Sequence, residues 1–352
     1  MSGADRSAGT DGEWCVPVRI EAEGIAAEVI PFGGSLTVVE VPDRVGTVDS
    51  VVLGFDDVTR YADHAANPHL GAMAGRYANR IGGGGFDLEG VRYDLAVNEG
   101  TTCLHGGPDG WGRRVWEVAS VATDAVSLTL ESLDGDQGFP GAVSVRVEYR
   151  VSASELLISA WFDSDRPTPV SVTNHGYWNL AGTRRASPDS RPAMTIDGHV
   201  LVLDAVEVLA VDAAKLPTGR TLPLADVLSG PVIGSAVLDH CVLLRGRSGV
   251  PAAVLCDPES GRTMTVTTSH PGLQVYTGDF LGEPFGRRTG VCLEAQHLPD
   301  APNGPGVADV LVSPGAPVGG GPHWWVRHRF GRGSDRDTHS SGTSHDDIGV
   351  LN

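Results

Sequence analysis

The sequence predicts an all-β protein built from many short strands. Its 352 residues contain short apolar segments that Gly, Pro and Asp interrupt repeatedly. In residues 143–151 every second side chain is apolar, which is typical of a strand with one face on the core. A helix is expected only at residues 57–64, and only a short one. The number of expected strands is larger than one small β-sandwich can hold. We therefore expect two extended, stacked and mainly antiparallel sheets.

These apolar segments place the elements along the chain. Strands are expected at residues 29–30, 36–41, 51–55, 126–130, 143–151, 156–162, 170–174, 199–203, 241–245, 263–268, 273–277, 291–294 and 324–330. Residues 181–193 and 217–235 are expected to form loops, because they contain Pro, Gly and Ser. The two ends of the chain are polar and lack periodicity. We therefore expect a disordered leader at 1–12, a single domain at 13–330 and a disordered tail at 331–352.

The composition argues against several classes of partner and compartment. A formal net charge of -18 argues against nucleic acid and against an anionic membrane. The five cysteines have no C-x-x-C spacing, so neither a disulfide framework nor a zinc signature is expected. No apolar run approaches the roughly 20 residues of a membrane span, and residues 1–12 lack the apolar core of a signal peptide. We expect a soluble cytoplasmic protein, either a monomer or a homodimer.

Residues 173–180 form the segment richest in chemistry. Their sequence, Thr-Asn-His-Gly-Tyr-Trp-Asn-Leu, combines an imidazole, two carboxamides and two aromatic rings. Aromatic side chains offer flat faces for a ring, carboxamides donate and accept hydrogen bonds, and His175 can transfer a proton near neutral pH. Taken alone, His175 is better explained as a hydrogen-bonded core histidine, and the other segments of the chain change that balance.

Four further segments collect polar and titratable side chains. Arg76, Asn79 and Arg80 precede the glycines at 82–85, in a segment that suits either a turn at a strand end or donors to an oxygen-rich ligand. This glycine run lacks the G-x-G-x-x-G and G-K-[ST] contexts, so a phosphate loop is not expected. His105 precedes two glycines, which allow close approach of a ligand.

The other two segments each bring an acid to a strand. Asp239 adjoins His240 at the head of a strand, where a salt-linked turn is an equally good interpretation. Glu294 follows Val-Cys-Leu, and a carboxylate inside an apolar strand is costly unless it is paired or functional.

Together these segments resemble one family, the aldose 1-epimerases, also called galactose mutarotases. The resemblance runs from about residue 16 to residue 330, with the motifs in the family's order. The matching segments are 42–44, 52–55, 67–68, 75–81, 104–107, 134–135, 138–141, 174–180, 217–219, 238–240, 274–278 and 293–296. Any one of these motifs is weak, but their number and order are specific.

The resemblance implies a β-supersandwich fold and an enzyme that interconverts the α and β anomers of a free aldose such as galactose or glucose. It implies that Glu294 is the general base, His175 the general acid and His105 a second active-site histidine. Residues that would bind the monosaccharide are Asn79, Arg80, Asp239, Tyr177 and Gln296. The chemistry is acid/base ring opening and reclosure, for which no metal or other cofactor is expected.

Several alternatives stay open at the level of sequence. Residues 221–234 depart from the family's usual pattern, and 184–191 look like an insertion, so an unusual sugar is possible as substrate. A non-catalytic sugar-binding module would tolerate loss of the acid/base pair. Asp239 with Glu294 could form a glycoside hydrolase pair. A zinc site from His105, His175 and Glu294 is conceivable without supporting spacing. Lys215, the only lysine, is the one candidate for a Schiff base and is expected in a loop.

Overall fold

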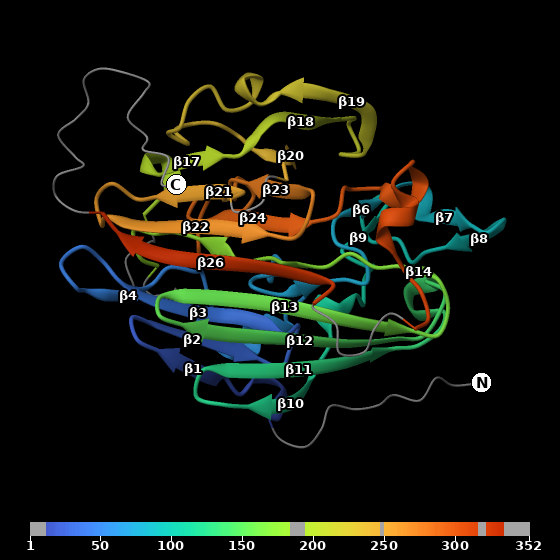
Figure 1. The fold of residues 1–352 in the computed structure, drawn as a ribbon, viewed down its shortest axis with the longest axis horizontal. Coiled ribbons are helices and arrows are strands. Elements are labelled where there is room, and N and C mark those ends of the chain that lie inside the picture. Colours follow the sequence, from blue (N-terminus) through green and yellow to red (C-terminus); the bar gives the residue numbers. More distant parts are fainter. Residues whose placement is uncertain (1–11, 184–193, 247–249, 316–321, 334–352) are drawn as a thin grey trace.

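The structure, a computed structural model, describes residues 12–183, 194–246, 250–315 and 322–333. Within these residues three large antiparallel sheets dominate the molecule (Figure 1). The predicted all-β class with large, mainly antiparallel sheets is confirmed. The expected number of two extended sheets is wrong, because the described residues form three large sheets.

The largest sheet has eight strands and runs across the molecule (Figure 1). In spatial order its strands are β10 (Glu117–Val121), β11 (Ala125–Ser132), β12 (Val143–Ser152), β13 (Glu155–Ser164), β26 (Trp324–Arg332), β22 (Arg262–Thr268), β21 (Ala253–Cys256) and β17 (Val200–Leu203).

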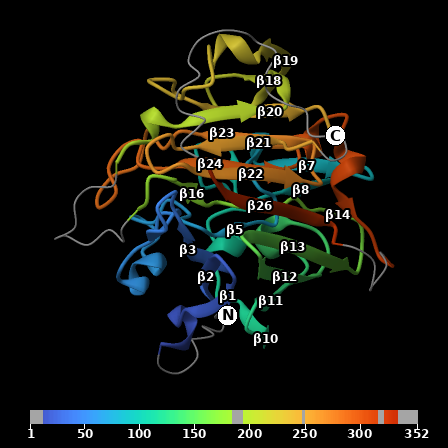
Figure 2. The same ribbon diagram turned by 60° about the vertical axis from the view of Figure 1, so that its left-hand side comes forward.

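Two further sheets pack against this one. A four-stranded sheet contains β1 (Val18–Ala22), β2 (Ile25–Ile30), β3 (Ser35–Pro42) and β4 (Val48–Ser50). A six-stranded sheet contains, in spatial order, β16 (Tyr177–Trp178), β24 (Val291–Gln296), β23 (Gly272–Tyr276), β20 (Asp239–Leu244), β18 (Ala205–Val211) and β19 (Pro217–Pro223). Figure 2 shows the four-stranded sheet beside β11 and β12, and the six-stranded sheet beside β21 and β22.

Short elements connect the large sheets. Four two-stranded sheets pair β5 (Met73–Ala74) with β15 (Thr173–Asn174), β6 (Arg80–Ile81) with β9 (Cys103–Leu104), β7 (Gly85–Leu88) with β8 (Val91–Asp94), and β14 (Thr168–Pro169) with β25 (Leu311–Val312). The helical elements of the described residues are 3-10 turns at Glu13–Cys15, Val58–Ala62, Gly82–Gly84, Trp111–Arg113, Asp136–Gly138, Ile196–Gly198, Leu224–Asp226, Ala301–Asn303 and Val307–Val310. Among these residues no helix is long and apolar enough to cross a membrane.

One apolar cluster joins the three large sheets. It includes Ile20 of the four-stranded sheet, Val147 of the eight-stranded sheet and Leu273 of the six-stranded sheet. The layers are also hydrogen-bonded, since the Nε1 group of Trp324 on β26 donates to the carbonyl oxygen of Ala295 on β24 at 2.8 Å. This bond fixes β24, the strand that carries Glu294, against the central sheet.

The strand predictions succeed where alternation is long. On β12 buried and less buried residues alternate along the whole strand, as the sequence pattern requires. Three predictions are wrong in extent. Residues 51–55 supply an isolated bridge from Val52 to Trp178 and not a strand, and within 170–174 the strand is limited to Thr173–Asn174. The predicted loop at 217–235 begins with β19, an edge strand, where Pro at both ends is tolerated because one side of the strand needs no partner.

At the two ends of the chain the observed elements begin and stop close to the predicted boundaries. The first 3-10 turn begins at Glu13, and β26 continues to Arg332, two residues into the predicted tail. The predicted disorder of 1–11 and of 334–352 lies outside the described residues.

Candidate active site

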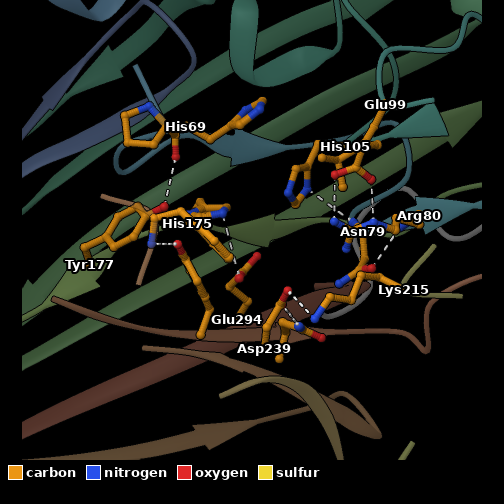
Figure 3. A pocket seen from close by; sticks show the side chains of 15 residues that line it. His69, Asn79, Arg80, Glu99, His105, His175, Tyr177, Lys215, Asp239 and Glu294 are labelled. Carbon is orange, nitrogen blue, oxygen red and sulfur yellow. Dashed lines mark hydrogen bonds and ion pairs between the residues drawn. The ribbon is translucent and has the colours of Figure 1, made fainter. Parts of the chain in front are cut away.

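A pocket of about 370 Å³ opens beside the six-stranded sheet, within the size range of small-molecule sites. Strands β20, β23 and β24 supply Asp239, Gln274 and Glu294 (Figure 3). Arg80 lies on β6 and Tyr177 on β16, whereas His69, His105, His175 and Lys215 lie in segments between strands. All the site residues expected from the sequence line this pocket except Gln296. The fold therefore brings together residues that lie up to about two hundred positions apart in the chain.

Glu294 lies in the middle of β24 and is only 2% exposed. Its neighbour across the sheet is Gln274 of β23, so both side chains emerge on the pocket face. Burial and, to a smaller extent, the charge of Asp239 raise the pKa of Glu294 to about 8, and the charge of Arg80 partly opposes this rise. Its Oε2 atom is buried and has no hydrogen-bond partner among the described residues. A carboxyl group with these properties is suited to exchanging a proton near neutral pH.

His175 lies in the segment between β15 and β16 and is 6% exposed. Its Nε2 atom is 3.8 Å from Oε1 of Glu294, and its Nδ1 atom is 3.6 Å from Sγ of Cys292. The ring packs against Tyr177 with centroids 5.1 Å apart. Burial lowers the pKa of His175 to about 4.

These opposite shifts have a common cause, because burial disfavours the charged form of each group. Between pH 4 and pH 8 the pair formed by Glu294 and His175 therefore holds one proton in total. One proton shared by two close groups is what simultaneous acid and base catalysis requires.

His105 approaches the same pair, with its ring centroid 5.3 Å from that of His175. The three side chains of His105, His175 and Glu294 each offer a ligand atom within 4.8 Å of the others, so the geometry alone would admit a metal ion. The hydrogen bonding of His105 does not fit one. Its Nδ1 accepts from the backbone N–H of Asn79 at 3.2 Å, which places the ring hydrogen of the neutral imidazole on Nε2. A metal-binding histidine instead donates its second N–H to an oxygen.

Arg80 and Asn79 form the wall on the side of His105. The Arg80 guanidinium makes two hydrogen bonds to Glu99, at 2.6 and 2.8 Å, and Oδ1 of Asn79 accepts from the Arg80 backbone N–H. Asn79 and His105 both have a positive φ, 65° and 52°, a conformation that costs energy and is often found at functional sites. The nearby Arg76 has a different role: it is buried and donates to the carbonyl oxygens of Pro140 and Gly141.

Asp239 is held from two sides. Its Oδ1 accepts from Nε2 of Gln274 at 2.7 Å, and its Oδ2 lies 3.5 Å from Nζ of Lys215 (Figure 3). A carboxylate held in this way can accept a hydrogen bond from a sugar hydroxyl without reorienting.

Two of the expected sugar-binding residues need comment. Tyr177 lines the pocket, but its hydroxyl donates to the Pro68 carbonyl oxygen at 3.2 Å, so its ring face is what remains for a ligand. Gln296 is fully buried, and the structure places it outside the pocket lining. It lies two residues beyond Glu294 on the same strand, opposite Gly272, which is past the pocket. The expectation that Gln296 contacts substrate is corrected accordingly.

Several residues that line the pocket were not among the expected site residues, and His69, Gln274 and Lys215 are three of them. Lys215 was considered from the sequence only as a candidate for a Schiff base. The ring of His69 lies 4.9 Å from that of His105, and its Nε2 is 3.3 Å from the Arg113 guanidinium. Burial holds the pKa of His69 well below its usual range. Gln274 could have been identified from the sequence, because it begins the segment 274–278 that matches the family. In the structure it lies opposite Glu294 on the adjacent strand.

The segments that depart from the family pattern do not border this pocket where they are described. No residue of 221–234 lines it, so the departure of this segment from the family pattern does not change the lining of the pocket. The segment 184–191, which the sequence suggests is an insertion, lies outside the described residues.

The family model described as aldose 1-epimerase matches residues 17–320. The chain belongs to the aldose 1-epimerase family. It is 35% identical over 317 residues to the galactose mutarotase of Bos taurus, covering 84% of this chain and 90% of that protein. It is 33% identical to the aldose 1-epimerase of Escherichia coli over 307 residues, covering 80% of this chain and 86% of that protein.

Solved structures share this fold. The aldose epimerase homologue from C. elegans superposes with a TM-score of 0.81 at 28% identity, covering 91% of this chain and 99% of its own. The galactose 1-epimerase of Lactobacillus acidophilus has a TM-score of 0.75 at 24% identity, a likeness in fold. The β-supersandwich expected from the family resemblance is thereby confirmed for this aldose 1-epimerase family member.

Proposed function

We propose that this protein is an aldose 1-epimerase, which interconverts the α and β anomers of a free aldose such as galactose or glucose. The observation that carries the proposal is the buried pair of Glu294 and His175, 3.8 Å apart in a pocket of polar side chains. The family membership supports the same reaction, since the relatives from Bos taurus and Escherichia coli are a galactose mutarotase and an aldose 1-epimerase. An inert sugar-binding module would have no use for a shared proton in a buried pair.

The reaction consists of two proton transfers and one bond cleavage. A base removes the proton from the anomeric hydroxyl, the C1–O5 bond breaks, and an acid delivers a proton to the ring oxygen. The product is the open-chain aldehyde. After rotation about C1–C2, the ring oxygen attacks the other face of the carbonyl and the two protons return. Atoms and electrons balance without any co-reactant.

In this proposal Glu294 exchanges the proton of the anomeric hydroxyl and His175 exchanges that of the ring oxygen. The form with a Glu294 carboxylate and a His175 imidazolium carries out ring opening, and it holds the same single proton as the neutral pair. Each transfer contributes about 10²–10⁴-fold to the rate. The Nε2–H group of His105, fixed by Asn79, donates to sugar oxygen and stabilises the charge that develops there.

The remaining pocket residues hold the ring. Asp239 and Gln274 bind hydroxyl groups, and so do Asn79 and Arg80. The ring face of Tyr177 covers an apolar face of the sugar. With the sugar held at several points, the proton donor and acceptor meet the reacting oxygens in one orientation.

Polarimetry of freshly dissolved α-D-galactose and α-D-glucose tests the proposal. The protein should accelerate the approach to anomeric equilibrium well above the buffer rate. Methyl α-D-galactoside is the matched control: it has no anomeric hydroxyl and should be neither epimerised nor cleaved. Release of methanol and galactose from it would indicate a glycoside hydrolase instead. Absence of acceleration on every free aldose tested would contradict the proposed function.

A further inference from the structure

Lys215 is the only lysine in the chain, and its ammonium group reaches the pocket. It lies in the turn between β18 and β19, outside every segment that carries the family resemblance. Its φ of 62° is unusual for a residue with a side chain, so the surrounding structure must hold it in place.

The turn itself is well braced. The carboxylate of Asp212 accepts from the backbone N–H groups of Ala214 and Leu216 at 2.8 and 3.0 Å. The side chain of Leu216 packs directly on Gly82, where a Cβ atom would come within 2.9 Å of it. Since Gly82 follows Arg80 closely in the chain, the turn is anchored to the wall of the pocket. Lys215 is therefore carried by a fixed element and not by a free loop.

The ammonium and the Asp239 carboxylate together suit a single hydroxyl group. Nζ of Lys215 lies 3.5 Å from Oδ2 of Asp239, a separation that leaves both groups able to take a further partner. The Lys215 side chain is 43% exposed and that of Asp239 is 22% exposed, so neither is sealed off from a ligand. An ammonium can only donate and a carboxylate can only accept, whereas a hydroxyl does both. Asp239 can accept the hydroxyl hydrogen while Lys215 donates to its oxygen.

We propose that Lys215 is a specificity-determining residue that, together with Asp239, binds one hydroxyl group of the sugar. The proposal rests on the proposed function for its substrate class, a free aldose. It adds a donor to that site at a position where neither the family resemblance nor the sequence analysis placed one.

Lys215 is not expected to form a covalent bond with the substrate. The ring-opened aldehyde could form an imine with an amine, with loss of water, but this requires the neutral amine. An ammonium paired with Asp239 has no lone pair to attack. Borohydride added during turnover should consequently leave the mass of the protein unchanged, and a reduced sugar adduct at Lys215 would overturn the non-covalent role.

The main test compares Lys215→Met with wild type on the turned-over aldose and on its 2-, 3-, 4- and 6-deoxy analogues. For the parent sugar KM should rise about 5- to 30-fold, with kcat within about threefold, since a charge-assisted hydrogen bond to substrate is lost. For one deoxy analogue the two proteins should have nearly equal KM, because the hydroxyl that Lys215 binds is missing. Lys215→Arg should keep most of the parent affinity.

Arg220→Met is the matched control, because it removes an exposed cation from the adjacent β19 outside the pocket. It should leave KM unchanged for all the sugars. An unchanged KM for Lys215→Met, or an equal loss across every analogue, would overturn the proposal. So would an equal loss in Arg220→Met, which would indicate a general effect of charge.

The two proposals can fail separately. If wild type does not accelerate mutarotation, the proposed function fails, and the same sugars are then compared by Kd from ligand-observed NMR. A Lys215→Met penalty confined to one hydroxyl would still support hydroxyl recognition by Lys215. A penalty spread over all of the sugars, or none, would overturn it.

Discussion

Oε1 of Glu294 lies 3.8 Å from Nε2 of His175, and both side chains are almost completely buried. At this distance and in this environment the charge of either group depends on the other. The protonation state of this pair therefore affects both the free energy of unfolding and the acid/base chemistry of the pocket.

Glu294→Gln should stabilise the protein at neutral pH. The folded-state pKa of Glu294 is raised to about 8, whereas the unfolded chain loses this proton near 4.5. The free energy of unfolding therefore decreases as the pH rises from about 4.5 to about 8, since the folded state retains a proton that the unfolded state has released. The variant lacks this dependence and should gain about 1–3 kcal/mol at pH 7. Urea unfolding at pH 5 and pH 7 checks this, and a variant less stable than wild type at pH 7 would contradict it.

The pH dependence of kcat/KM should be a broad bell. Below about pH 4 the pair takes up a second proton and has no base, and above about pH 8 it loses its last proton and has no acid. Isolated side chains would give a narrower plateau, between about 4.3 and about 6.5. Initial rates corrected for the buffer reaction measure this profile. A fall in activity that is already complete at pH 7 would show that burial does not shift the two groups.

His175→Asn should lower kcat by about 10²–10⁴-fold while KM changes much less, because the proton is needed in the transition state. His328→Asn provides a control for the loss of a buried histidine. His328 is buried against Trp178, with ring centroids 4.7 Å apart, and it lies outside the pocket. That variant should melt at a lower temperature yet keep its kcat per folded molecule. If His175→Asn behaved in the same way, His175 would be a packing residue only.

Removal of metal ions should not change the activity. Nδ1 of His105 accepts a hydrogen bond from the backbone N–H of Asn79, so the ring hydrogen is on Nε2. Nε2 therefore has no free lone pair with which to bind a metal ion. Dialysis against EDTA, followed by rate measurement and metal analysis, tests this prediction. Activity that disappears with EDTA and returns with zinc would identify a metal centre at His105, His175 and Glu294.

The sequence was informative wherever a pattern repeats or a motif is dense. Alternation over 143–151 is enough to predict β12. A carboxylate inside the apolar segment 291–294 indicated a functional role for Glu294, and this residue lines the pocket. Short segments were less predictable. Residues 51–55 resemble a strand in composition, but Val52 makes only one bridge, a result of tertiary pairing that no local pattern records.

The sequence motifs identified most of the residues of the site, but they did not show which side chains line the pocket. Gln296 was expected to contact substrate because it belongs to the Glu294 motif, yet it lies opposite Gly272 and past the pocket. Gln274 was not singled out, although strand register places it opposite Glu294. Lys215 is in the pocket because its turn packs on Gly82, a contact between segments more than 130 residues apart that only the folded chain shows.

The most direct test of the central claim is the anomeric exchange rate of Glu294→Gln, measured by NMR magnetisation exchange on the aldose that wild type turns over. The amide keeps the shape of the side chain but cannot take the proton of the anomeric hydroxyl. With the buffer reaction subtracted, the enzymatic rate should fall by about 10²–10⁴-fold in a protein that is folded and still binds the sugar. A rate equal to that of wild type would remove Glu294 from the mechanism and contradict the assignment of the acid/base pair.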